Sequence, residues 1–262
     1  MRRRRTFPAF LLALSTFFTL FALTGAQATG ETAGPVLLGR LAATLFELPR
    51  WTPAHREDIE AAALARTTGP VQVEGLPVAV QVPAATALSG DDGQLESAIA
   101  AAAGRRLWDE GRLAFADGKE ATGDISLSSP VRWVISLLER EDHVAWQISL
   151  FVALAASGAL GLLVTFTSEG GIASVLRCIA FGAAGFALAS GALWLVAEVL
   201  SGGFSTPVDA EVARIVRDCA WMGLRAGFAV GFASGAGLLV VRVTGQRDNR
   251  YAEWPGAVDE PA

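Results

Sequence analysis

Four glycines recur at every fourth position of one long apolar run: Gly223, Gly227, Gly231 and Gly235. Because an α-helix has 3.6 residues per turn, this spacing places all four along one side of a helix. A face without side chains lets a second helix approach backbone to backbone. Helices associate in this way in lipid, where burying apolar area gives no driving force. The row therefore predicts a transmembrane helix whose glycine face packs against another helix.

The distribution of charge divides the chain into a polar part and a membrane part. The 262 residues are 52% apolar and 18% charged, with a net charge of −5. Charged residues gather in residues 29–145, where acids outnumber bases, and are scarce in the apolar runs from Ile148 onward. The negative balance provides no basic surface for nucleic acid. We expect the lipid bilayer, and not nucleic acid, to be the partner of this chain.

Residues 1–28 have the three parts of a secretory signal peptide. Arginines occupy positions 2–5, an apolar run extends over 7–23, and Ala26 and Ala28 flank Gln27 as a small-x-small end. This pattern predicts cleavage after Ala28. An uncleaved anchor is the alternative interpretation, because the apolar run is long for a signal peptide. With either outcome the arginines stay in the cytoplasm and the chain from residue 29 is exported.

The exported region, residues 29–128, mixes helical and strand patterns. Valines alternate with other residues over 71–82, and Gly75 and Pro77 interrupt them, which predicts two short strands or a bulged hairpin. An alanine-rich helix is expected over 94–116. This region is therefore predicted to be a small α+β or mostly helical extracytoplasmic domain.

Three apolar helices are expected to follow, each long enough for a hydrocarbon core of roughly 30 Å. The predicted segments are a juxtamembrane helix at 129–145, a first span at 146–166, a cytoplasmic loop at 167–174, a second span at 175–200, an external loop at 201–206, a long helix at 207–243 containing the third span (219–241), and a disordered cytoplasmic tail at 244–262. The arginine count on the two sides is a tie, so the N-terminal segment decides the orientation. The fold class is a mainly α protein of the cell membrane: a three-helix bundle with its N-terminal domain outside and its tail in the cytoplasm.

Small residues at four-residue spacing recur in the other two spans. The first span carries Ala153, Ser157 and Gly161, and the second carries Ala183, Ala187 and Gly191. Such rows allow tight helix crossings in a membrane. Together with the glycine row they are the predicted helix-packing residues of the bundle.

Apart from Arg177 at the start of the second span, the charged residues that fall inside predicted spans are Glu198 and Arg225. A charge there is costly and raises a functional hypothesis by default. One interpretation pairs the two side chains across adjacent helices, and the other lets the arginine extend outward to lipid headgroups. Arg225 points away from Gly223 and Gly227 on a helical wheel. If the glycines face their own chain, Arg225 faces lipid or another subunit; if Arg225 meets Glu198, the glycine row is left for oligomerisation.

Residues with reactive side chains are sparse. Cys178 and Cys219 are expected to be packing residues at opposite membrane faces, and Glu139 with His143 provides too few ligands for a metal. The chain has no nucleophile elbow, phosphate loop, CxxC or HExxH. No catalytic residue, metal site or cofactor is therefore predicted.

These observations favour a non-enzymatic integral membrane protein. The first hypothesis is a sensor, scaffold or accessory subunit of a bacterial-type envelope complex, in which an exported domain is coupled to a compact glycine-packed bundle. Its partner would be a second copy of the chain or another membrane protein. One alternative is an oligomeric pore or transport component, although the spans offer little polar lining. A membrane-embedded enzyme is the second alternative, and no acid, base and nucleophile set supports it.

Overall fold

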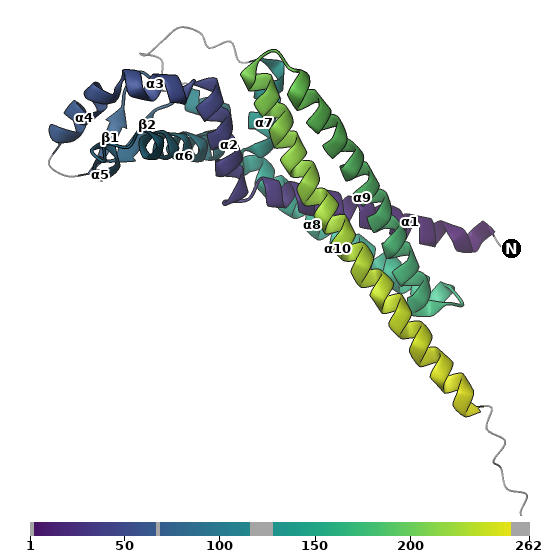
Figure 1. Cartoon of the computed structure of the whole chain (residues 1–262). Helices are drawn as coiled ribbons and strands as arrows, with labels where there is room; N and C mark the ends of the chain where they lie inside the picture. Colours follow the sequence, from purple (N-terminus) through teal and green to yellow (C-terminus); the bar gives the residue numbers. More distant parts are fainter. Residues whose placement is uncertain (1–2, 67–68, 116–127, 253–262) are drawn as a thin grey trace, which may run out of the picture. The chain divides into compact units, whose positions relative to one another are not determined.

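The computed structural model describes residues 3–66, 69–115 and 128–252, and most of them are helical (Figure 1). Within these described ranges, four helices are long and apolar enough to cross a membrane: Phe7–Ala28, Arg140–Thr167, Gly171–Gly203 and Pro207–Thr244. Three of them contain the spans predicted from the sequence. The remaining helix, Phe7–Ala28, lies in the segment predicted to be a signal peptide. The predicted tail beyond Ala252 lies outside the described residues.

The chain divides into two compact units. The first consists of Met1–Phe21, Phe151–Ala189 and Gly223–Ala262, and the second of Ala22–Leu150 and Ser190–Met222. The long helices α1 (Arg3–Ala28), α8 (Arg140–Thr167), α9 (Gly171–Gly203) and α10 (Pro207–Ala252) each contribute residues to both. The shorter elements belong to the second unit alone.

The second unit is built around two helices that touch at glycines. Its elements are α2 (Ala33–Leu45), α3 (Leu48–Ala54), α4 (Arg56–Leu64), β1 (Pro70–Val73), β2 (Val80–Pro83), α5 (Ala84–Ala87), α6 (Asp92–Glu110), the 3-10 helix η1 (Gly111–Phe115) and α7 (Ser129–Leu138). A Cβ on Gly104 of α6 would strike the Pro35 carbonyl oxygen and the Gly39 backbone of α2. Figure 1 shows α6 running beside α2 and the strand pair. The core of this unit therefore depends on a backbone-to-backbone crossing.

The two predicted strands form an antiparallel hairpin. β1 pairs with β2 in the register Pro70↔Pro83, Val71↔Val82, Gln72↔Gln81 and Val73↔Val80. The four valines are buried and the glutamines exposed, as the alternation requires. Gly75 connects the strands at a φ of +86°, a region that favours glycine. The strand prediction is confirmed.

Several predicted boundaries differ from the structure. The helix predicted over 94–116 ends at Glu110, because Gly111 adopts a φ of +56°. The helix predicted over 129–145 breaks at Glu139, where the backbone is extended, and α8 begins at Arg140. Long helices also continue into predicted irregular segments, α9 through 201–203 and α10 through 244–252. No proline interrupts either extension, and a glycine near a helix end costs only about 1 kcal/mol.

Candidate functional site

The middle of the glycine row faces the small residues of α9. An ideal Cβ on Gly227 would lie 2.9 Å from the Ala187 Cβ and 3.1 Å from the Ala183 carbonyl oxygen, and one on Gly231 would lie 3.8 Å from the Ala183 Cβ. Ala183 is fully buried and Ala187 is 6% exposed. The rows predicted in the second and third spans therefore meet each other within one chain, with α9 and α10 side by side in Figure 1.

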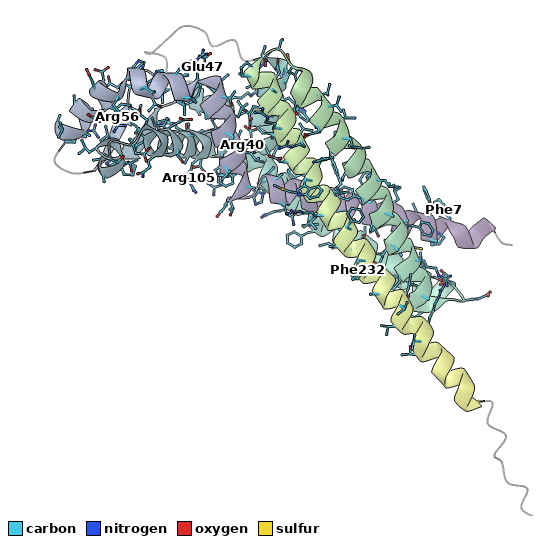
Figure 2. All side chains as sticks on the ribbon, viewed as in Figure 1. Phe7, Arg40, Glu47, Arg56, Arg105 and Phe232 are labelled. Carbon is cyan, nitrogen blue, oxygen red and sulfur yellow. The ribbon has the colours of Figure 1, made fainter. Side chains whose placement is uncertain are left out.

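The two ends of the glycine row differ. Gly223 is buried, whereas Gly235 is exposed and a Cβ there would have no described atom within 4 Å. On the other side of the helix Arg225 is exposed, and Phe232, labelled in Figure 2, is 82% exposed. In the structure Gly227 and Gly231 therefore face their own chain, whereas the neighbour of Arg225 stays a prediction.

The row predicted in the first span contacts α1 through a hydroxyl cluster. The Ser157 hydroxyl lies 2.8 Å from the Ser15 hydroxyl and 3.0 Å from the Thr19 hydroxyl. A Cβ on Gly161 would lie 3.8 Å from Val175 Cγ1 of α9. The remaining predicted packing residues, Ala153 and Gly191, are half-buried. Only part of this row therefore makes a close helix contact.

A cluster of ion pairs connects α2 to the first turns of α10 within the second unit. The Arg40 Nη1 donates to Asp218 Oδ2 at 2.7 Å, and Arg40 Nη2 lies 2.7 Å from Glu211 Oε1. The second contact lacks hydrogen-bond alignment, so it acts mainly by charge. The Glu211 side chain is 7% exposed and that of Arg40 is 39% exposed. Arg40 is labelled in Figure 2. Arg40 therefore neutralises two carboxylates of α10, one of them buried.

Three further residues extend this Arg40 cluster. Arg214 Nη1 lies 3.2 Å from Glu211, Arg217 Nη2 lies 3.2 Å from Asp218, and Arg217 Nη1 donates to Glu198 of α9 at 3.0 Å. The Glu198 carboxylate predicted to lie in the membrane thus has an arginine partner near the start of α10. Its proposed pairing with Arg225 stays a prediction.

The pKa values of Arg40 and Glu139, which lie outside the four long apolar helices, are shifted. Burial alone would lower the pKa of Arg40, but the hydrogen bond to Asp218 and the charges of Glu211 and Asp218 raise it overall. Arg40 is therefore always charged at physiological pH. Burial raises the pKa of Glu139, and the nearby carboxylates of Asp142 and Glu141 add to the effect.

The sequence analysis did not single out Arg40, Glu211, Arg214, Arg217 or Asp218. Two signals were present. Arg40 is the single charge in an otherwise apolar helix, and the acids at 211 and 218 are seven residues apart, on one side of α10. Neither signal identifies the partner, because Arg40 and Asp218 are 178 residues apart in the chain.

The residues of the described part do not form a metal site or a disulfide. No three His, Cys, Asp or Glu side chains gather there in a group suited to a metal ion. Cys178 and Cys219 are free thiols, each half-buried.

The described part of the chain is mostly helical, and its four long apolar helices are consistent with a membrane protein. Within the second unit, the Arg40 cluster joins α2 to the first turns of α10 by ion pairs. Comparison with protein-family models, with curated proteins and with solved structures found no match.

Proposed function

We propose that this chain is a multi-pass protein of a bacterial-type cell membrane, with its N-terminal domain exported and its C-terminal end in the cytoplasm. The arginines at 2–5 favour a cytoplasmic N-terminus. If α1 is retained, four crossings bring the C-terminal end back to the cytoplasm. If residues 1–28 are cleaved, the chain starts outside and three crossings bring its C-terminal end to the cytoplasm. Both interpretations of α1 therefore lead to the same proposed orientation.

For α1 we favour retention as the fourth membrane helix. Within the first unit, Leu12 and Leu20 are buried, and Phe17 contacts Phe186 edge-on at 5.4 Å between ring centroids. A Cβ on Gly182 would strike the Ala13 carbonyl oxygen, so α1 and α9 touch through their backbones. Interhelical hydroxyl contacts such as that of Ser157 with Ser15 and Thr19 are a further feature of helices that stay associated in lipid.

The peptide bond between Ala28 and Thr29, where the sequence predicts signal-peptide cleavage, lies between two buried residues. Ala28 and Thr29 are 5% and 1% exposed, and the Thr29 carbonyl accepts a hydrogen bond of 2.8 Å from the Trp108 indole. We therefore expect the protein purified from its membrane to retain residues 1–28. Intact-mass spectrometry checks this, and an N-terminal and a C-terminal epitope tag should appear on the same band. A mass corresponding to a chain that begins at Thr29 would restore the signal-peptide interpretation.

The function we propose is that of a non-enzymatic sensor, scaffold or accessory subunit of an envelope complex. The observation that carries it is the pairing of Arg40 on α2 with Glu211 and Asp218 on α10. Helix α10 continues from these carboxylates to the glycine row that packs on α9. A change in the exported domain that displaced Arg40 would therefore act on α10, and the glycine row of α10 belongs to the helix bundle.

The two alternatives predict different measurements. A pore would conduct ions when the purified protein is reconstituted in liposomes, and an enzyme would convert a substrate without a protein partner. The test of the accessory-subunit function is purification of the full chain in mild detergent, with quantitative identification of the proteins that accompany it. We expect one partner at near-stoichiometric yield, which the R40M variant loses and the R50A control retains.

R50A is a matched control because the Arg50 side chain is 86% exposed and, among the described residues, pairs only with Glu47, three positions earlier. If no partner accompanies the wild-type protein, or if liposomes become conductive, the proposed function is wrong.

A further inference from the structure

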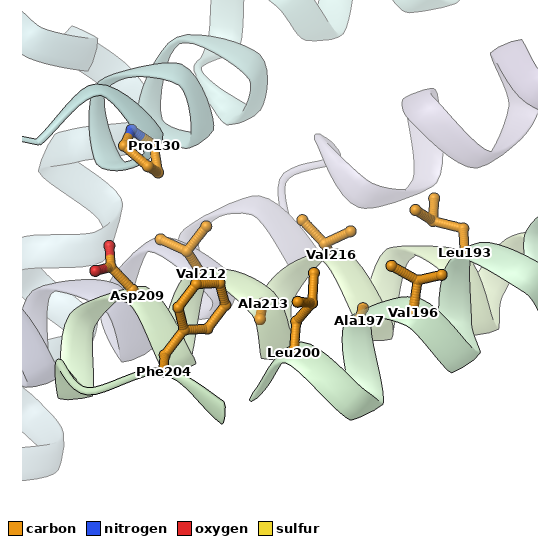
Figure 3. A pocket seen from close by; sticks show the side chains of 10 residues that line it. All are labelled: Pro130, Leu193, Val196, Ala197, Leu200, Phe204, Asp209, Val212, Ala213 and Val216. Carbon is orange, nitrogen blue, oxygen red and sulfur yellow. The ribbon is translucent and has the colours of Figure 1, made fainter. Parts of the chain in front are cut away.

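A cavity of about 300 Å³ lies between the end of α9, the start of α10 and the first residues of α7. All its lining residues belong to the second unit. Figure 3 shows Leu193 at one end of it and Asp209 with Pro130 at the other. We call it the hairpin groove. Its volume is at the lower end of the range for small-molecule sites, roughly 300–1,000 Å³.

The walls of the hairpin groove are hydrocarbon. Val196, Leu200, Val212 and Val216 provide most of them, and Asp209 is the single ionisable residue of the lining. Val196 and Leu200 are 54% and 48% exposed, so the groove is open along one side. Apolar area left in water costs roughly 25 cal/mol per Å². An apolar chain lying in the groove would remove this cost.

The groove crosses the level at which the membrane should end. The run from Cys178 to Ala197 of α9 has no charge and extends over about 30 Å at helical rise, which matches a hydrocarbon core. It stops at Glu198, which pairs with Arg217 of α10. Leu193 lies about 8 Å before this ion pair along α9, and Asp209 lies about 12 Å beyond it along α10.

Leu193, at one end of the groove, therefore belongs to the uncharged run of α9, and Asp209, at the other end, carries a negative charge. The Asp209 Oδ2 accepts the Thr206 hydroxyl at 2.6 Å, and no cationic side chain of the described residues pairs with this carboxylate. A carboxylate at the end of a hydrocarbon groove suits an amphiphile whose headgroup donates hydrogen bonds and carries a positive charge.

From this arrangement we propose that the hairpin groove binds the acyl chain of an outer-leaflet phospholipid with an amine headgroup, whose ammonium group contacts Asp209. The lipid chain enters from the bilayer at Leu193, and the headgroup lies beyond the Glu198–Arg217 pair. The proposal rests on the membrane orientation proposed above, and not on the identity of a protein partner.

The test uses the full-length protein in nanodiscs that contain phosphatidylethanolamine with a photoreactive acyl chain. After irradiation and digestion, mass spectrometry maps the crosslinked residues. We expect crosslinks on 193–216 of the wild-type protein, and their loss in A213L and A197L, which place extra carbon atoms in the groove. Ala159 is exposed on α8, so A159L is the volume-matched control and should keep the groove crosslinks.

Headgroup selectivity is tested separately by D209N, which keeps the size of the side chain. A hydrogen bond to a charged group contributes about 1.5 kcal/mol or more, so the preference for phosphatidylethanolamine over phosphatidylcholine should fall by up to tenfold.

The proposal is overturned if crosslinks on 193–216 are no more frequent than on the exposed residues of α8, or if they are unchanged in both groove-filling variants. Preferential crosslinking to a lipid-modified protein would show that the groove binds the acyl chain of that protein, and the phospholipid proposal would then be wrong. A protein partner that still accompanies the chain in these cases would leave the proposed function standing.

Discussion

Replacing Gly227 with leucine is expected to destabilise the bundle by about 1–3 kcal/mol, because the new side chain has no room. A Cβ at this position would already lie 2.9 Å from the Ala187 Cβ and 3.0 Å from the Ala187 backbone nitrogen. The two helices would have to separate, and the buried face of Ala183 would be exposed. Thermal unfolding of the detergent-solubilised protein measures the change.

G235L is the matched control for this variant. Gly235 is in the same helix and the same row, but a Cβ there meets no described atom within 4 Å. Both variants gain the same helix propensity, about 0.8–1.0 kcal/mol relative to glycine, so their difference isolates the packing cost. Equal stability of G227L and G235L would refute the contact between the glycine row and α9.

A cysteine pair decides whether the glycine row faces its own chain. The Cβ positions of residues 183 and 231 are 3.8 Å apart, inside the range of roughly 3.5–4.5 Å that a disulfide requires. With Cys178 and Cys219 replaced by alanine, oxidation of A183C/G231C should give a crosslinked monomer on a non-reducing gel. A crosslinked dimer would mean that the glycines face a sister subunit.

Replacing Arg40 with methionine should cost about 2 kcal/mol of unfolding free energy. Breaking a fully buried pair costs about 3–5 kcal/mol, and the 39% exposure of the Arg40 side chain reduces this by solvent screening. The loss arises mainly at Glu211, which is buried and, of its ion-pair partners in the described residues, would keep only Arg214. The same unfolding experiment that compares the glycine variants measures this effect.

Two further variants separate charge from general damage. R50A, at an exposed pair, should change stability by less than about 0.5 kcal/mol. In the double variant R40M/E211Q the uncompensated carboxylate is gone, so the losses should not add, with a coupling energy of about 1–3 kcal/mol. Strict additivity of R40M and E211Q would show that the pair does not join α2 to α10.

Local patterns in the sequence were sufficient to predict those elements that are specified by residues close together in the chain. Alternating valines with Gly75 between them predicted the hairpin, because a period of two can bury one face of a strand pair. Four-residue spacing of small side chains predicted that the helices at 175–200 and 207–243 would present bare faces. These rules are local and need no knowledge of a partner.

Boundaries were predicted less well because tertiary contacts and single residues set them. Gly111 ended the alanine-rich helix early, at a position where a side chain would strike the Glu139 carboxylate. Conversely, the glycines at 202 and 203 did not stop α9 where the sequence suggested. A glycine permits a turn but does not impose one.

The sequence by itself determined that this chain has long apolar helices, a polar region with two strands, and a glycine face in its last long helix. Only the tertiary structure decided which surfaces meet: that the glycines lie against Ala183 and Ala187, and that Glu198 pairs with Arg217. It also brought Arg40 to Glu211 and Asp218, far along the chain. The physical reason is that periodicity specifies the face of an element, whereas the partner of that face depends on how the whole chain packs.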